Sequence, residues 1–207
     1  MTGRPEPRVL DPLPIEMSRP LVLLRLGYRS ATQVPQKTSR LLDAVLDEAR
    51  PLFAPRAICA VEAIERLDGG GLVIGGTLRT GSRSLATRLE GCGRALLFAA
   101  TIGPALEDWV RRLSDAGEIT RALLADACGS SAAIALGTAL ESAVTREFRD
   151  LGLEPTKRYA PGYGDWDLES QAPLMALVDG TRIGITLTDD FLMLPGKSIS
   201  GVIGGRG

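Results

Sequence analysis

Residues 56–78 read RAICAVEAIERLDGGGLVIGGTL, a pattern that indicates antiparallel strand pairing. The first half alternates partly between apolar and polar residues, which is the period of a strand, and the second half is another short apolar run. Asp68, Gly69 and Gly70 separate the two halves, and glycine readily adopts the positive φ angles of a tight turn. The stretch therefore predicts a hairpin. Its glycines lack the Gly-x-Gly-x-x-Gly spacing, which favours a plain turn over a dinucleotide site.

Helical and strand patterns follow one another on both sides of this hairpin. Spacing of apolar residues at three and four predicts helices over residues 18–29, 38–53, 82–92, 103–117 and 118–152. Thr38 or Ser39 is the candidate cap of the second helix, and Gly129 is a candidate break in the longest one. Strands are expected over residues 94–103, 182–188 and 197–205. The order has no regular βαβ rhythm, so the expected fold class is α+β, with a mainly antiparallel sheet flanked by helices.

Composition limits the classes of function. The 207 residues include 24 Lys and Arg against 25 Asp and Glu, without a basic stripe, which argues against binding to nucleic acid or to an anionic membrane. The start of the chain is polar and proline-rich, so no signal peptide is predicted. The apolar run at residues 128–140 is shorter than the roughly 20 residues of a membrane helix. We expect a single cytoplasmic domain over residues 1–207, with a polar leader at 1–17.

The chain contains no histidine and only three cysteines, which are far apart in the sequence: Cys59, Cys92 and Cys128. A Ser-His or Cys-His nucleophile is therefore excluded, and the usual ligand sets for zinc, haem and iron–sulfur clusters are missing. We predict no catalytic side chain and no metal site. Any chemistry is expected to belong to a bound small molecule or to a partner protein.

One row of the longest predicted helix carries unusually small side chains. Positions four apart lie on one inclined row, and this row reads Gly129, Ala133, Gly137, Glu141 and Thr145. Two explanations remain open. The row packs closely against another element, or a flat ligand lies along it and its cationic or hydroxyl groups meet Glu141.

The segment KRYAPGYGDWDLESQ, residues 157–171, holds three of the nine aromatic residues of the chain: Tyr159, Tyr163 and Trp166. Gly162 and Gly164 permit a sharp turn, and Arg158 supplies a planar donor suited to a carboxylate. Tyrosines in a turn can simply cover the edge of the core. Aromatic residues on a glycine-framed loop also favour a binding site, because loops carry recognition while the scaffold holds them.

Two motifs in this half of the chain resemble the activation domain of cobalamin-dependent methionine synthase. RYAPGY at residues 158–163 is similar to the Arg-x-x-x-Gly-Tyr motif of that family, and GITLTDDFLMLPGKSISGVIG at 184–204 is similar to its C-terminal motif. The helical ALES, residues 139–142, falls where the family places a glutamate. The resemblance covers residue 132 to the C-terminus, and the N-terminal half is more similar to small stand-alone relatives.

The resemblance implies a C-shaped α+β domain with a twisted antiparallel sheet that holds S-adenosylmethionine near a corrinoid. Arg158 would bind the methionine carboxylate, and Glu141 would face the sulfonium or amino group. Gly162 would let the loop close on the ligand, which Tyr163 would contact. Backbone contacts to the adenosine would come from Ile203 and Gly204.

The chain departs from the family after the Gly-Tyr pair. Where the family usually continues with Pro-Ala-Cys-Pro, this sequence has GDWDL at residues 164–168. In the family this segment meets the corrinoid module, so Asp165, Trp166 and Asp167 are expected to face a partner. The aspartate that the family uses near its N-terminus has no secure counterpart, and Glu16 is the candidate.

The leading hypothesis is a stand-alone reactivation subunit, an accessory component of a cobalamin-dependent methyltransferase system that cannot methylate homocysteine alone. It would bind S-adenosylmethionine and support reductive methylation of cob(II)alamin on a separate corrinoid protein or split methionine synthase. A one-electron reductant such as a flavodoxin or ferredoxin would take part. The alternative is a docking module that keeps the fold without using the ligand, and a third reading places another methyl donor or nucleotide in the groove.

Overall fold

The computed structural model describes residues 6–30 and 34–207, so positions 1–5 of the predicted leader lie outside the described residues. The main sheet has the strand order β4-β3-β2-β5-β9-β6, and β1 also pairs with β2. Its strands are β1 (Arg8–Leu10), β2 (Arg56–Arg66), β3 (Leu72–Ile74), β4 (Leu78–Thr80), β5 (Cys92–Thr101), β6 (Glu154–Pro155) and β9 (Ser198–Arg206). All the strand pairings described are antiparallel. The predicted α+β class with a mainly antiparallel sheet is confirmed.

The predicted hairpin is present as β2 and β3. Ile64 pairs with Ile74 in its register, and the turn contains Gly69 and Gly70, whose φ angles are 92° and 89°. The turn reading of these glycines is therefore confirmed. Residues 8–10 of the expected polar leader form strand β1, which pairs with β2 over Ala57 to Cys59.

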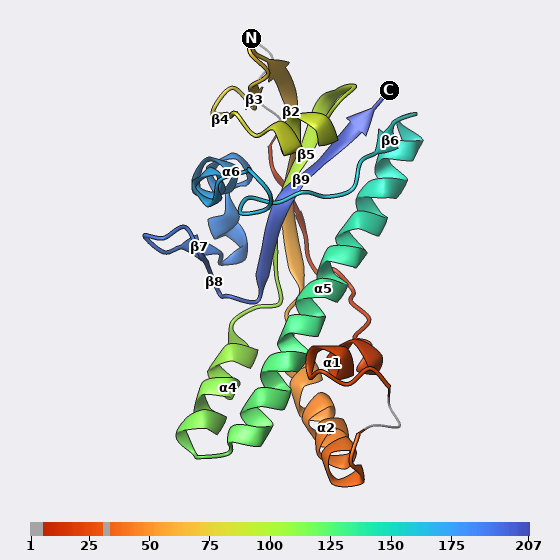
Figure 1. Ribbon diagram of the computed structural model, residues 1–207, viewed down its shortest axis with the longest axis vertical. Coiled ribbons are helices and arrows are strands. Elements are labelled where there is room, and N and C mark those ends of the chain that lie inside the picture. The colour runs from red at the N-terminus through yellow and green to blue at the C-terminus, as the bar shows by residue number, and fades with distance from the viewer. Residues whose placement is uncertain (1–5, 31–33) are drawn as a thin grey trace.

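The sheet is buried on both faces. Successive side chains of a strand point to opposite faces, and along β5 Phe98 belongs to one buried cluster while Leu97 belongs to the other. Helix α5 (Ile119–Asp150) lies along the first face, and α1 (Arg19–Arg25), α2 (Gln36–Ala49) and α4 (Ala105–Asp115) pack against α5 (Figure 1). Helix α6 (Gln171–Val178) packs on β5 over the second face, where Leu85 of α3 (Arg83–Arg88) and the loop residue Trp166 belong to the buried cluster. This double burial explains why β5 reads as a continuous apolar run.

Six α-helices are described in residues 6–30 and 34–207: α1 (Arg19–Arg25), α2 (Gln36–Ala49), α3 (Arg83–Arg88), α4 (Ala105–Asp115), α5 (Ile119–Asp150) and α6 (Gln171–Val178). The predicted cap of α2 is wrong. The helix begins earlier, after Pro35, whose carbonyl accepts from the Ser39 N–H at 2.9 Å, so Thr38 and Ser39 lie inside the helix.

Helix α5 is unbroken, so the candidate break at Gly129 is also wrong. A side chain at this position would overlap Leu106 of α4 and come within 3.2 Å of Lys197. The glycine therefore permits close helix packing rather than interrupting the helix. The 32-residue helix is long and apolar enough to cross a membrane, but 56% of its most apolar window is buried inside the protein. We describe it as a core helix.

The segment after α6 has less strand than its alternating pattern predicts. Residues Gly180–Ile183 form the 3₁₀ helix η4, and only Thr186–Leu187 form strand β7, which pairs with β8 (Met193–Leu194). Asp179 and Gly184 have the left-handed φ angles of 56° and 77°; Asp179 ends α6, and Gly184 ends η4. Two short 3₁₀ turns, η2 (Arg50–Leu52) and η3 (Leu168–Ser170), complete the fold.

Candidate functional site

The centre of the candidate site is the guanidinium of Arg158, which lies on the backbone of α5. A Cβ atom at Gly137 would overlap Arg158 Nη1, so only glycine leaves room for this side chain. Arg158 Nε lies 3.6 Å from Glu141 Oε1, and the Arg158 backbone N–H donates to the same oxygen at 3.4 Å. The structure thus brings together Arg158 and Glu141, two of the predicted site residues. Glu141 lies one helical turn after Gly137 on α5.

Arg158 Nη1 is buried and has no hydrogen-bond partner among the described residues. A buried donor without an acceptor costs roughly 1–3 kcal/mol, and more when it is charged. The Arg158 side chain as a whole is 34% exposed, although Nη1 itself is closed to solvent. A planar carboxylate fits this donor, because guanidinium groups bind carboxylates in a two-pronged geometry. The residues present therefore suit the carboxylate end of an amino-acid-like ligand.

The loop that follows Arg158 is a compact turn. The Gly162 N–H donates to Trp166 O at 2.7 Å, and the Trp166 N–H donates to Tyr163 O at 3.0 Å. Gly162 and Gly164 have φ angles of 86° and 57°, which side chains rarely tolerate. Tyr163 lies at the tip with 67% of its surface exposed. The turn predicted from these glycines is therefore present, and it displays Tyr163 to solvent.

The side chain of Trp166 does not face outward, which corrects the expectation that it meets a partner. It is only 1% exposed and stacks on Tyr159, with ring centroids 5.9 Å apart and planes 6° from parallel. The guanidinium of Arg88 covers the Tyr159 ring, 5.1 Å from its centroid. Tyr159 and Trp166 therefore close the edge of the core, which is the structural alternative that the sequence left open for the tyrosines.

Asp165 is exposed but bound within the molecule. Its carboxylate accepts from Ser82 Oγ at 2.6 Å and from the backbone N–H groups of Arg83 at 2.8 Å and Ser84 at 3.1 Å. The bond from Ser82, followed by those from Ser84 and Arg83, holds the pKa of Asp165 well below its usual value. Asp165 is exposed, so the expected contact with a partner stays a prediction, although its carboxylate is already hydrogen-bonded to the start of α3. The Asp167 side chain is exposed.

Ile203 and Gly204 lie inside β9 and are buried. Ile203 pairs with Leu96 of β5, while the Gly204 N–H donates to Thr156 Oγ1 and the Gly204 carbonyl accepts from the Thr156 N–H, both at 2.9 Å. In this conformation neither of these Gly204 groups is free to bind a ligand. The expected contact of the Ile203 and Gly204 backbone with an adenosine stays a prediction.

Close packing explains the part of the row of small residues on α5 from Gly129 to Gly137. Gly129 accommodates Leu106 and Lys197, and Gly137 accommodates Arg158, so protein side chains fill the groove there. On the C-terminal side of Gly137 the surface of α5 forms a hollow of about 380 Å³, lined by Thr138, Glu141, Ser142, Thr145, Arg146 and Arg149. The flat-ligand reading therefore remains possible only from Glu141 onward.

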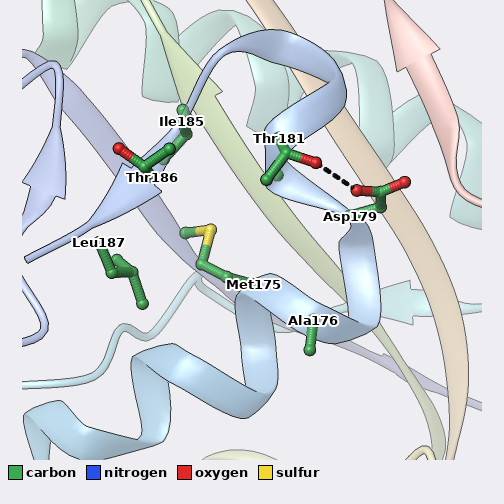
Figure 2. A pocket seen from close by; sticks show the side chains of 8 residues that line it. Met175, Ala176, Asp179, Thr181, Ile185, Thr186 and Leu187 are labelled. Carbon is green, nitrogen blue, oxygen red and sulfur yellow. Dashed lines mark hydrogen bonds between the residues drawn. The ribbon is translucent and has the colours of Figure 1, made fainter.

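A second hollow, of about 290 Å³, lies between α6 and β7, and Figure 2 shows its lining. Its walls are largely apolar, including Met175, Ile185 and Leu187. The Thr181 hydroxyl donates to Asp179 Oδ1 at 2.7 Å, as the dashed line in Figure 2 marks. None of the predicted site residues lines this hollow.

Two further predicted features concern residues away from the loop. Glu16 is exposed in the segment between β1 and α1, and no described contact joins it to Arg158 or Glu141. The three cysteines are buried and unpaired, and burial raises the pKa of Cys128 to about 12. No group of three or more Cys, Asp or Glu side chains placed to hold a metal ion occurs within residues 6–30 and 34–207.

The fold is an antiparallel α+β domain, and its candidate site holds a guanidinium nitrogen without a described hydrogen-bond partner beside a carboxylate, in a chain without histidine. The sequence profile of the family described as "Vitamin B12 dependent methionine synthase, activation domain" matches residues 92–206. The chain belongs to this family. The matched region contains α5, the Arg158 loop and β9.

A solved structure shares the fold. "Crystal Structure of the MetH Reactivation Domain bound to AdoHcy" is similar to this chain with a TM-score of 0.74 and 17% sequence identity. The similarity covers 98% of this chain and 79% of that one, so it extends beyond the family match into the N-terminal half. The search of curated proteins found no match.

Proposed function

We propose that this protein binds S-adenosylmethionine and acts as a separate reactivation subunit for a corrinoid protein. The observation that carries the proposal is the buried, unpaired Arg158 Nη1 beside Glu141 on α5. Family membership supports it, and so does the relative of the same fold, which was solved with AdoHcy bound. The carboxylate of the ligand would complete the hydrogen bonding of Arg158.

Each proposed residue has a distinct task in holding the ligand. Arg158 binds the methionine carboxylate, and Glu141 attracts the positive amino or sulfonium group by charge. Gly162 lets the backbone approach, and Tyr163 covers the ligand from the exposed tip of the loop. The bound molecule supplies an activated methyl group, so the protein contributes position and orientation and needs no general base.

The partner would be a corrinoid-binding methyltransferase or a methionine synthase lacking its own activation module. A flavodoxin or ferredoxin would provide the electron that reduces cob(II)alamin to cob(I)alamin, the form that accepts the methyl group. We propose that these proteins meet in the cytoplasm and that residues 1–207 act as one domain. Asp165 and Asp167 are the exposed residues on either side of the buried Trp166, and they are the candidates for contact with the partner.

A docking module that does not use the ligand is the second candidate. The altered segment at residues 164–168 favours it, because this is where the sequence departs from the family. The contacts of Asp165 and the burial of Trp166 weaken it, because both residues serve the fold of the loop. Capture of a corrinoid protein that is unaffected by Arg158→Ala would support the docking function.

The test is calorimetric titration of S-adenosylmethionine into the wild type, Arg158→Ala and Arg19→Ala. Arg19 is a matched control, because its side chain is 33% exposed and pairs with one carboxylate, Asp43, at 2.7 Å. Loss of a charge-assisted pair is worth about 2 kcal/mol, so Arg158→Ala should bind about thirtyfold more weakly. Arg19→Ala should bind like the wild type. A folded wild type that gives no binding heat would refute the proposed function.

A further inference from the structure

The loop that carries Tyr163 is fixed to the rest of the protein at several points. Tyr159, at its start, forms an isolated antiparallel bridge with Val202 of β9 through N–H···O distances of 3.0 and 2.8 Å. The Tyr159 hydroxyl donates to Tyr163 O at 2.9 Å, and the Tyr159 ring stacks on Trp166. These contacts hold the two ends of the turn close to one another.

The third attachment is the Asp165 carboxylate, which joins the loop to the first turn of α3. Its Oδ1 accepts from Ser82 Oγ and the Ser84 N–H, and its Oδ2 accepts from the Arg83 N–H. Ser82 Oγ in turn accepts from the Leu85 N–H at 3.0 Å and so caps the helix. The capping hydroxyl and the loop carboxylate form one continuous hydrogen-bonded group, in which both carboxylate oxygens are used.

Helix α3 also packs closely against the loop at Gly164. At Gly164 a Cβ atom would come within 2.5 Å of the Tyr159 hydroxyl and 3.2 Å of Ser84 Oγ, so the loop passes through a narrow gap between them. Arg88, one helical turn further along α3, covers the Tyr159 ring. The helix therefore contacts both the start and the tip of the loop.

We propose that Asp165 is a positioning residue: its bonds to α3 hold residues 160–167 in the conformation that presents Tyr163 to the ligand. The effect on the ligand rests on the proposed function. Asp165 acts through the loop, since its own carboxylate is bound to α3. This role also accounts for the departure at residues 164–168, where an aspartate bonded to a helix and a buried tryptophan provide the rigidity of the turn.

Preorganisation of this kind changes affinity in a predictable direction. A ligand that binds an ordered loop does not have to order it, whereas the free energy of ordering a mobile loop reduces the affinity. Asp165→Asn is the most informative variant, because asparagine keeps the shape of the side chain but has only one acceptor oxygen and a nitrogen that cannot accept a hydrogen bond. It must lose either the two bonds to Oδ1 or the one to Oδ2. Asp43→Asn is the matched control, since Asp43 Oδ1 also accepts a charge-assisted bond, from Arg19, on a different pair of helices.

The first measurement is amide hydrogen exchange without ligand. The N–H groups of Gly162 and Trp166 are bonded within the loop, so the wild type should protect them. Asp165→Asn should accelerate exchange in residues 160–167 by about tenfold or more, as expected when a hydrogen-bonded segment opens locally. Asp43→Asn should not change it. Unchanged exchange in Asp165→Asn would overturn the positioning role, whether or not the protein binds S-adenosylmethionine.

The second measurement is the affinity of each variant for S-adenosylmethionine, measured equally far below the melting temperature of that variant. Asp165→Asn should bind about tenfold more weakly because ordering of the loop then accompanies binding, and Asp165→Glu, which keeps the carboxylate, should recover part of the loss. A merely structural role predicts that affinity follows the melting temperature in Asp43→Asn as well. Faster exchange with wild-type affinity would refute the link between this loop and the ligand. If the wild type does not bind, the proposed function fails, while the exchange result still decides the role of Asp165.

Discussion

Replacement of Gly137 by alanine should separate ligand binding from stability. The backbone of Gly137 is helical, and a Cβ atom there would overlap Arg158 Nη1. That atom is the end of a flexible side chain, so the guanidinium can swing away without moving the helix. The substitution therefore displaces the proposed carboxylate anchor without removing any charged group from the protein.

Two opposing effects set the change in the free energy of unfolding. Alanine in a helix interior is more favourable than glycine by about 0.8–1 kcal/mol. Against this, the Arg158–Glu141 pair is lost, but its atoms are 3.6 Å apart and both side chains are about a third exposed, 34% and 35%. Such a pair contributes at most about 1 kcal/mol. The unfolding free energy should therefore stay within about 1 kcal/mol of the wild type.

Binding should change far more than stability. Without the Arg158 anchor, the free energy of S-adenosylmethionine binding should weaken by about 2 kcal/mol, which is about thirtyfold in affinity. Urea unfolding measures the first quantity and calorimetric titration the second. Gly93→Ala is the control, because it has open space around its Cβ position and should leave binding unchanged. Wild-type affinity in Gly137→Ala, or a loss of stability above about 2 kcal/mol, would refute this placement of Arg158.

Two further predictions concern buried groups. Trp166→Ala should lower the unfolding free energy by about 3–5 kcal/mol, as for other large aromatic truncations, whereas Trp166→Phe should cost much less because the buried indole N–H has no described partner; equal losses in denaturant unfolding would contradict this. Burial raises the pKa of Cys128 from 9.0 to about 12, so the unfolded thiol ionises first as the pH rises. Stability linked to Cys128 should thus be complete below pH 9 and decline between pH 9 and about 12, and a Cys128→Ala variant should lack that part of the decline in thermal melts.

Local patterns predicted the parts of the fold that depend on local interactions. The β2–β3 hairpin follows from alternation and from the glycines at 69 and 70, and α5 follows from its long apolar period. The errors arise where another element decides. Gly129 reads as a helix breaker until Leu106 of α4 is placed against it, and Ser39 reads as a cap until the helix is seen to begin after Pro35.

The candidate site shows the same division. Arg158 and Glu141 were predicted through a family resemblance, and the structure places them 3.6 Å apart. The inward roles of Asp165 and Trp166 could not be predicted, because their partners are distant in sequence or are side chains stacked in three dimensions. Ser82, which binds Asp165, lies 83 residues earlier. Its only sequence signal is a serine before a helix, which predicts a cap but not a second bond to a distant loop.

The contact between Gly137 and Arg158 also has an evolutionary consequence. Since a methyl group at position 137 would occupy the place of the guanidinium, Arg158 keeps this position only while residue 137 is glycine. A lineage that acquires a larger residue at 137 must also shorten or redirect residue 158, and it would then lose the anchor. Across related chains, the two positions should therefore change together, and a glycine retained one helical turn before the glutamate should mark the members that still hold the ligand.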